Sequence, residues 1–293
     1  MGFYLLIVGS VLASGIGVMP SMAQRSDSWG FGGDFFKTLP SRVALVADKG
    51  RLGESGEVML GVVVNLAEGW KTYWRNPGDS GIPPIFDWSS SNNMEVTEML
   101  WPAPERFDLP DDSSFGYKNE VLFPVRVVAP DINEPMDVAL TLSYGVCREV
   151  CVPLEDKARL SIPPGPPNSS MAAADIQTAL RLVPGEKDTT SGLVLDYVGL
   201  KPKGNALAIG LQSEGGVDVG PYHLVVEAVD IPSVYFGVPV VEAQEQDKVQ
   251  FRIPVDRSEG ATSLEGKTIT ITVREGRRAL SETVQVGYSQ ANE

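Results

Sequence analysis

The sequence predicts an all-β chain made of two antiparallel β-sandwich domains, which are joined by a proline-rich linker and a short helix. Three observations support this prediction. Apolar residues alternate with polar ones over several short segments, which is the pattern of half-buried strands. Glycine (30 residues) and proline (22 residues) are frequent and gather in turn clusters between these segments. The clusters are spaced as in an antiparallel sandwich, and helical periodicity is confined to one short stretch.

The first 23 residues have the character of a secretion signal. They carry no charged side chain, are predominantly apolar from Phe3 to Met19 and end in Ser21-Met22-Ala23, a small-x-small sequence of the kind that signal peptidases cleave. We therefore expect export, with cleavage after Ala23. An uncleaved anchor is the alternative, because no Lys or Arg precedes the apolar stretch. Residues 24–36 are expected to form a flexible arm.

The first domain is expected to span residues 37–165. Its strands are indicated by the alternating apolar residues of segments 60–66 and 138–144. Turn clusters occupy 76–81 and 109–114, where Gly, Pro, Asp and Ser accumulate. Four tryptophans in strand-like segments are expected to pack in the core: Trp70, Trp74, Trp88 and Trp101.

Residues 166–188 form the predicted connection to the second domain. A run of prolines from Pro163 to Pro167 makes a stiff linker. A helix is predicted over 170–182, because apolar side chains recur at i, i+4 and i+7 from Ile176 onward. The second sandwich is expected over 189–293. Strict alternation returns there in the segments 193–197, 249–255, 269–273 and 284–288.

The charge of the chain and its single histidine argue against several classes of function. Lys and Arg number 24 against 38 Asp and Glu, a net charge of -14 at pH 7. A nucleic-acid binder is not expected, because phosphate contacts need clustered cations. His223 is the only histidine in the sequence, so we expect neither a site with two imidazoles nor a His-activated nucleophile in the first domain. No small-molecule cofactor is expected.

The two cysteines of the sequence, Cys147 and Cys151, follow the predicted strand 138–144. In an exported chain, such a pair is expected to form a disulfide. Residues four apart on one continuous strand lie about 13 Å apart, which is too far for a disulfide. If residues 148–150 instead form a three-residue hairpin loop, the cysteines become directly opposed on neighbouring strands and can be linked.

The phase of the strand predicts the direction in which the cysteines point. The apolar residues of 138–144 occupy the even positions, and Cys147 falls in the other phase. Both cysteines should therefore point away from the core, covered by a neighbouring loop or by nothing. A structural staple is the alternative to a redox-active bond. It is a poor explanation, because a loop of about five residues contributes only about 2 kcal/mol, against about 4.7 kcal/mol for a 100-residue loop.

Four motifs follow one another along the first domain: Gly69-Trp-Lys-Thr-Tyr-Trp-Arg-Asn-Pro-Gly-Asp-Ser-Gly-Ile-Pro-Pro84, Trp101-Pro-Ala-Pro-Glu-Arg-Phe107, Gly116-Tyr-Lys-Asn-Glu-Val-Leu-Phe-Pro-Val125 and Tyr144-Gly-Val-Cys-Arg-Glu-Val-Cys-Val-Pro153. They resemble the N-terminal periplasmic domain of DsbD-type thiol:disulfide interchange proteins, and most of all the ScsB branch, which is named for suppression of copper sensitivity. The resemblance covers roughly residues 40–163. A weaker similarity to ScsB-like chains continues in the second domain, through Val226-Glu227 and Phe236-Gly237-Val238-Pro239.

The resemblance implies an immunoglobulin-like sandwich in the periplasm. Its catalytic residues would be Cys147 and Cys151, which would pass reducing equivalents from a membrane-embedded electron donor of the DsbD/ScsB type to periplasmic thiol proteins. In that family an aromatic ring on a cap loop shields the cysteines. Residues 114–120 resemble this loop, which makes Phe115 the expected lid and Tyr117 its neighbour. Ordinary strand packing is the alternative for both rings.

Two other functions stay open from the sequence. The thiolates of Cys147 and Cys151 could hold Cu(I), a soft cation, which would make the protein a copper-binding protein. The chain could also be a non-catalytic binding module with an inert disulfide. Four acidic residues near the expected lid are interpreted as a solvated loop rather than as a docking site for a basic partner: Glu105, Asp108, Asp111 and Asp112.

The neighbours of the cysteines in the sequence act on the thiols in opposite directions. Arg148 would favour the thiolate and Glu149 would oppose it, and a hairpin has no helix N-terminus to lower a thiol pKa. No strong acidification of either thiol is therefore expected. Access to the sulfur atoms should be the main control of exchange.

Overall fold

The computed structural model describes residues 39–78, 81–109, 112–185, 191–201, 205–214, 221–228, 231, 234–245, 247–257 and 264–288. The predicted signal peptide (1–23) and arm (24–36) lie outside the described residues. No helix in these ranges is long and apolar enough to cross a membrane.

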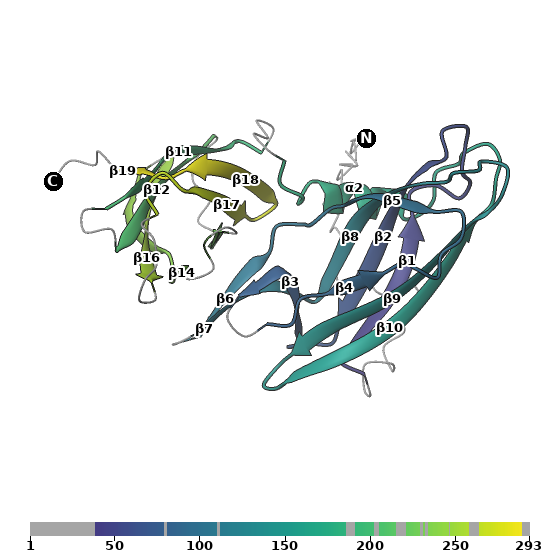
Figure 1. The fold of residues 1–293 in the computed structure, drawn as a ribbon, viewed down its shortest axis with the longest axis horizontal. Helices are drawn as coiled ribbons and strands as arrows, with labels where there is room; N and C mark the ends of the chain where they lie inside the picture. Colours follow the sequence, from purple (N-terminus) through teal and green to yellow (C-terminus); the bar gives the residue numbers. More distant parts are fainter. Residues whose placement is uncertain are drawn as a thin grey trace, which may run out of the picture. The chain divides into compact units, whose positions relative to one another are not determined.

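The first sandwich consists of two antiparallel sheets (Figure 1). Its strands are β1 (Ser41–Ala47), β2 (Glu57–Leu66), β3 (Lys71–Gly78), β4 (Ile85–Asp87), β5 (Glu95–Met99), β6 (Glu105–Leu109), β7 (Asp112–Lys118), β8 (Glu120–Val128), β9 (Met136–Cys147) and β10 (Cys151–Ile162). One sheet has the order β1-β2-β8-β5, and the other has the order β10-β9-β3-β7-β6 with β4 beside β9. This arrangement confirms the predicted fold class for the first domain.

The core of the first sandwich lies between its two sheets. Even-numbered residues of β9, from Met136 to Val146, belong to the buried cluster, as the phase of the strand predicted. Trp74 is completely buried, and the other three tryptophans pack against the cluster with partial exposure. The predicted packing role of the tryptophans is therefore confirmed. Burying each large apolar side chain contributes about 1.5–3 kcal/mol relative to leaving it in water.

Residues 114–118 form a strand, where the resemblance to a cap loop predicted a loop. They belong to β7, which pairs with β3 on one side and with β6 on the other. The alternation of Phe115, Gly116 and Tyr117 is the local cause, because it places both rings on the core face. The chain turns only at Asn119, whose φ of 62° lies in the left-handed region that Asn tolerates.

The helix of the connection, α2 (Ala173–Leu180), lies within the predicted range 170–182. Ile176 is completely buried and Ala179 nearly so, and these two side chains give the helix its buried face. The N–H of Ala172 donates to the hydroxyl of Ser170 just before the first turn. This short helix is the one helix among the described elements, as the all-β prediction requires.

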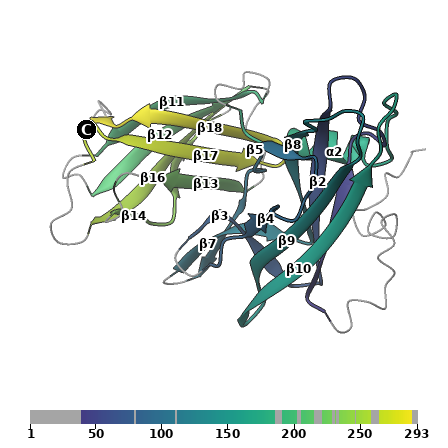
Figure 2. The same ribbon diagram turned by 45° about the vertical axis from the view of Figure 1, so that its right-hand side comes forward.

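The second sandwich also consists of two sheets, which Figure 2 shows from another side. Its strands are β11 (Leu193–Leu200), β12 (Ala206–Ser213), β13 (Tyr222–Glu227), β14 (Val234–Phe236), β15 (Val240–Gln244), β16 (Lys248–Arg257), β17 (Thr268–Glu275), β18 (Arg278–Gln285) and β19 (Gly287–Tyr288). One sheet has the order β14-β16-β12-β11-β19 with β15 beside β16, and the other has the order β13-β17-β18.

The predicted strand 284–288 divides between the two sheets of the second sandwich. β18 ends at Gln285 beside β17, and β19 pairs with β11 in the parallel direction. Between them, the Val286 side chain is buried and its N–H donates to the carbonyl of Lys267. The apolar alternation continues through the division, so the sequence pattern alone does not reveal it.

Candidate functional site

The two cysteines meet at the loop end of the hairpin that β9 and β10 form. Cys147 ends β9, Cys151 begins β10, and the two are directly opposed in the antiparallel register. Their Cα atoms lie 4.2 Å apart and a disulfide joins them. The loop between them is residues 148–150, as predicted from the spacing. The continuous ladder from Met136 opposite Ile162 down to the cysteines determines this register.

The two sulfur-bearing residues differ in their access to solvent. Cys147 is 3% exposed. Cys151 is exposed, as are the three loop residues, and Val150 at the tip is 72% exposed. A thiol that approaches from solution therefore meets Cys151 first.

Tyr73 on β3 covers the disulfide. Its hydroxyl donates to Cys147 Sγ at 2.7 Å and lies 3.2 Å from Cys151 Sγ. Trp74, the next residue, points into the core, so Tyr73 lies on the outer face of the same sheet. Cys147 lies on that face too, which confirms the direction predicted from strand phase. The cover differs from the expectation, because it is an aromatic ring from a neighbouring strand and not a loop.

In the segment 81–84, Gly81 lies against the Tyr73 ring, and the next residue, Ile82, lies against Gly145 of β9. A Cβ atom on Gly81 would lie 2.6 Å from Tyr73 Cδ1, and a Cβ atom on Gly145 would lie 2.6 Å from Ile82 Cβ. No side chain tolerates such contacts, so glycine at these two positions lets the segment approach β3 and β9 closely. Tyr73 is 1% exposed as a result. The segment belongs to the first of the four motifs, to which sequence analysis assigned no covering role.

Phe115 and Tyr117 pack in the core, which corrects the expected lid. Both belong to the buried cluster of the first sandwich. The Arg106 guanidinium lies 5.2 Å from the Phe115 ring centroid, and the Tyr117 hydroxyl donates to the carbonyl of Pro102 at 2.7 Å. Burial raises the pKa of Tyr117 well above its ordinary value, so its hydroxyl stays a donor. Gly116 lies opposite Tyr73 in the register, and its two neighbours therefore take the other face of β7.

Cationic side chains lie next to the disulfide on the outer face of the sheet. Lys71 is directly opposite Cys147, and Lys118 is directly opposite Lys71. Lys71 Nζ donates to Ser114 Oγ at 2.9 Å. Sequence reasoning recognised only Arg148, whose guanidinium lies 5.9 Å from the Trp70 ring centroid. It missed Lys71 because the proximity of this residue to Cys147 arises from the pairing of β3 with β9, which are far apart in the chain.

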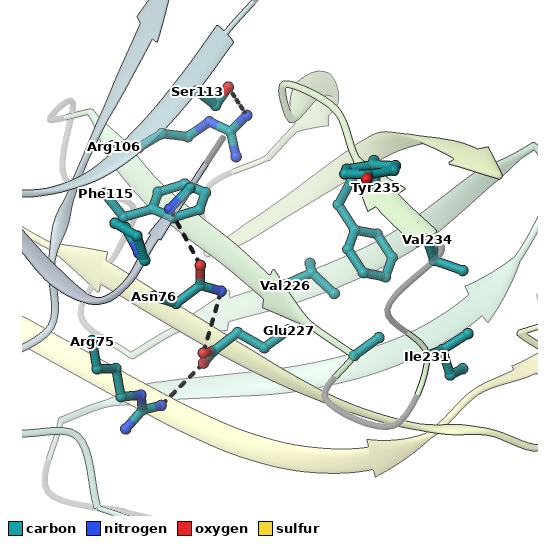
Figure 3. A pocket seen from close by; sticks show the side chains of 14 residues that line it. Arg75, Asn76, Arg106, Ser113, Phe115, Val226, Glu227, Ile231, Val234 and Tyr235 are labelled. Carbon is teal, nitrogen blue, oxygen red and sulfur yellow. Dashed lines mark hydrogen bonds and ion pairs between the residues drawn. The ribbon is translucent and has the colours of Figure 1, made fainter. Parts of the chain in front are cut away.

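A separate cavity of about 480 Å³ is lined by residues of both sandwiches (Figure 3). Its polar side chains bind one another. Glu227 accepts from Arg75 at 3.0 Å and from Asn76 at 3.4 Å, and Arg106 donates to Ser113 Oγ at 2.7 Å. The bonds from Arg75 and Asn76 to Glu227 link the first sandwich to the second at this cavity.

His223 takes part in the same junction. Its Nδ1 accepts the backbone N–H of Arg106 at 3.0 Å, and burial lowers the pKa of the imidazole. Two of the acidic residues that were interpreted as a solvated loop are paired instead: Asp108 with Arg106 at 2.7 Å, and Glu105 with Arg274 at 3.6 Å. Asp111 lies outside the described residues.

Comparisons with known proteins find two family models that each match one part of the chain. Residues 42–162 match the family model described as thiol:disulfide interchange protein DsbD, N-terminal, and residues 182–289 match a domain of unknown function, DUF8393. The N-terminal periplasmic domain of ScsB from Proteus mirabilis is 24% identical, with a TM-score of 0.63, and the match covers 84% of this chain and 92% of that chain. The Neisseria meningitidis DsbD N-terminal domain in the reduced form is 18% identical, with a TM-score of 0.23, over 43% of this chain and 90% of that chain. No curated protein matches the chain.

Proposed function

We propose that this chain, whose residues 42–162 form a DsbD/ScsB-type N-terminal domain, is a periplasmic thiol:disulfide exchange protein that uses Cys147 and Cys151. It relays reducing equivalents from a membrane-embedded electron donor of the DsbD/ScsB type to periplasmic thiol proteins. The observation that carries the proposal is the asymmetry of the disulfide. Cys151 is exposed at a hairpin tip, whereas Cys147 is buried and accepts a hydrogen bond from Tyr73.

This asymmetry assigns a role to each sulfur in the step that reduces the protein. A thiolate of the donor attacks Cys151 Sγ and forms a mixed disulfide with it. The bond between the two cysteines breaks, and its electron pair goes to Cys147 Sγ, which leaves as a thiolate. A second thiolate of the donor then attacks the mixed disulfide and releases Cys151. Two electrons have passed to this protein, and the donor keeps a disulfide.

Tyr73 favours the departure of Cys147. A hydroxyl at 2.7 Å from the sulfur can donate a charge-assisted hydrogen bond to the thiolate. A thiol with a lower pKa is a better leaving group. Lys71 is the residue directly opposite Cys147, but its ammonium donates to Ser114 Oγ and lies beside the Phe107 ring. The contact of Tyr73 comes from β3, so the sequence neighbours of the cysteines did not reveal it.

The second half of the relay uses the same asymmetry. The accessible Cys151 thiolate attacks the disulfide of a periplasmic substrate and forms a mixed disulfide, while one substrate sulfur leaves with the electron pair. Cys147 then attacks Cys151 Sγ and releases the second substrate sulfur. The protein returns to its oxidised form, and the substrate becomes a dithiol.

Two measurements on the full chain test the proposal. Equilibration with glutathione should reduce the disulfide in the folded protein, because an inert structural bond has a potential below about -300 mV and resists that buffer. Cys147→Ala should trap mixed disulfides through Cys151, and Cys151→Ala, the matched control, should trap far fewer. A bond that resists millimolar reduced glutathione would refute the exchange function. Equal trapping by the two variants would refute the assignment of roles.

The two alternative functions receive less support from the site. A purely structural disulfide has no need of an exposed cysteine at a hairpin tip, and Cys151 is exposed. Over the residues that the structure describes, no group of three or more His, Cys, Asp or Glu side chains is placed to hold a metal ion. A Cu(I) ion would have to rely on the two thiolates.

A further inference from the structure

A row of paired residues runs from the disulfide across the outer face of the sheet. Cys151 lies opposite Cys147, Cys147 lies opposite Lys71, and Lys71 lies opposite Lys118, on the strands β10, β9, β3 and β7. Directly opposed residues share one face of a sheet. Neighbouring strands are about 4.8 Å apart, so Lys118 lies about 10 Å from Cys147. The row thus leads from an exposed sulfur to two ammonium groups.

One aromatic ring lies close to both ammonium groups. The centroid of the Phe107 ring, on β6, is 5.0 Å from Lys71 Nζ and 4.6 Å from Lys118 Nζ. Like charges that are directly opposed destabilise a sheet, and the ring face offsets part of the repulsion through cation–π contacts. The sheet therefore holds two like charges together beside its reactive bond against their mutual repulsion.

The hairpin tip adds an apolar contact to this surface, because Val150 is 72% exposed. Arg148 is exposed too, but its guanidinium lies 5.9 Å from the ring of Trp70, which packs against the core cluster, so it is not part of the row. Glu149 is the carboxylate within the tip. Glu105, on the neighbouring strand β6, is held by Arg274 at 3.6 Å. The surface near Cys151 therefore combines the exposed Val150 side chain with the two lysines of the row.

We infer that this cation row, defined as Lys71 and Lys118, docks an acidic segment of the partner thiol protein next to the partner's reactive cysteine. The inference rests on the proposed function and adds the chemistry of the partner. The net charge of -14 does not oppose it. At physiological ionic strength the Debye length is about 8 Å, so distant carboxylates are screened while the nearby ammonium groups are not.

Synthetic peptides test the inference on the oxidised full chain. Three peptides of equal length carry one reduced cysteine flanked by Glu, Gln or Lys. The second-order rate constant for reduction of the disulfide is measured for each peptide and divided by the rate constant of the same peptide with 2-hydroxyethyl disulfide, an uncharged disulfide, which removes differences in intrinsic thiol reactivity without adding a charge preference. The Glu peptide should react about tenfold faster than the Gln peptide at about 0.15 M ionic strength, where the distant carboxylates are screened, since each exposed ion pair is worth a few-fold. This advantage should vanish near 1 M salt.

Two lysine variants locate the effect. Lys118→Gln should lower the ratio of the Glu to the Gln peptide by about threefold. Lys157→Gln is the matched control, because this exposed lysine lies on the same face of β10, six residues or about 20 Å along the strand from Cys151. It should leave the ratio unchanged. Thermal unfolding of both variants verifies that they fold.

The outcomes separate the inference from the function on which it rests. Equal normalised rates for the Glu and Gln peptides, or an equal effect of the two lysine variants, would overturn the acidic partner and leave thiol exchange intact. Failure of every peptide to reduce the disulfide would overturn the exchange function, and the inference with it.

Discussion

Replacing Tyr73 by phenylalanine isolates the hydrogen bond that the buried sulfur receives. The substitution keeps the ring, which is 1% exposed and lies against Gly81, and removes only the hydroxyl that donates to Cys147 at 2.7 Å. We expect the same hydroxyl to stabilise the thiolate form of Cys147 in the reduced protein. Loss of a donor to the charged form raises the pKa of a thiol.

The size of the effect follows from the type of bond. A hydrogen bond to a charged group contributes about 1.5–3 kcal/mol, and one pKa unit corresponds to about 1.4 kcal/mol. Tyr73→Phe should therefore raise the pKa of Cys147 by about one to two units. Because Cys147 is then a poorer leaving group, a thiol that attacks Cys151 should also reduce the disulfide more slowly. The stability of the oxidised protein should change by less than about 1 kcal/mol, since a sulfur atom is a weak acceptor.

The pKa can be measured by NMR titration of the Cys147 Cβ in isotopically labelled Cys151→Ala protein, with and without Tyr73→Phe. Tyr117→Phe is the matched control. This tyrosine is equally buried and donates to the carbonyl of Pro102 rather than to sulfur. A shift below about 0.3 units in the Tyr73 variant, or the same shift in the Tyr117 variant, would show that the hydroxyl does not stabilise the thiolate.

Three further predictions follow from the same structure. Phe115→Ala should destabilise the protein by about 3–5 kcal/mol in denaturant unfolding, because the ring belongs to the core cluster. It should not change the rate at which small thiols reduce the disulfide of the folded protein. Faster reduction with little loss of stability would instead support a role of Phe115 as a lid. Gly145→Ala should destabilise the protein by about 1–3 kcal/mol, because its Cβ would lie 2.6 Å from Ile82 Cβ and displace this side chain. The displacement should also speed reduction of the disulfide by small thiols. Reduction at the wild-type rate would show that the segment containing Ile82 does not shield the disulfide. Burial lowers the pKa of His223, so the unfolded chain binds a proton more readily than the folded protein, and the stability of the protein should fall as the pH drops below about 6.5. In His223→Gln, the urea midpoint of unfolding should depend less on pH. An unchanged pH profile in this variant would show that the imidazole does not cause the loss of stability.

Local features of the sequence predicted the hairpin of the site correctly. Cys147 and Cys151 are four residues apart, and the ladder that joins β9 to β10 continues directly from their loop. Strand period and loop length therefore suffice to place them opposite each other, and the same period shows that Cys147 points away from the core. The packing of Trp74 was predictable for a similar local reason, because a large aromatic side chain in an apolar strand is usually buried in the core.

The lid was assigned wrongly because a similarity to a loop was given more weight than the local pattern. Phe115 and Tyr117 are separated by one glycine, an alternation that favours a strand with both rings on one face. The ring that covers the sulfur atoms, Tyr73, occurs in a motif that the sequence analysis quoted. Its neighbour Trp74 shares the same strand but has the opposite phase, and no local signal shows which of the two rings meets Cys147.

The sequence by itself determined the all-β class, the core phase of the strands and the register of the cysteine hairpin, because each depends on interactions between residues close together in the chain. Only the tertiary structure decided what surrounds the disulfide. The pairing of β3 with β9 brings the Tyr73 hydroxyl to Cys147 and places Lys71 opposite it, and the pairing of β3 with β7 places Lys118 opposite Lys71. Period and composition specify that a strand will pair, but its partner is selected by the packing of the whole sandwich, which a local pattern does not contain.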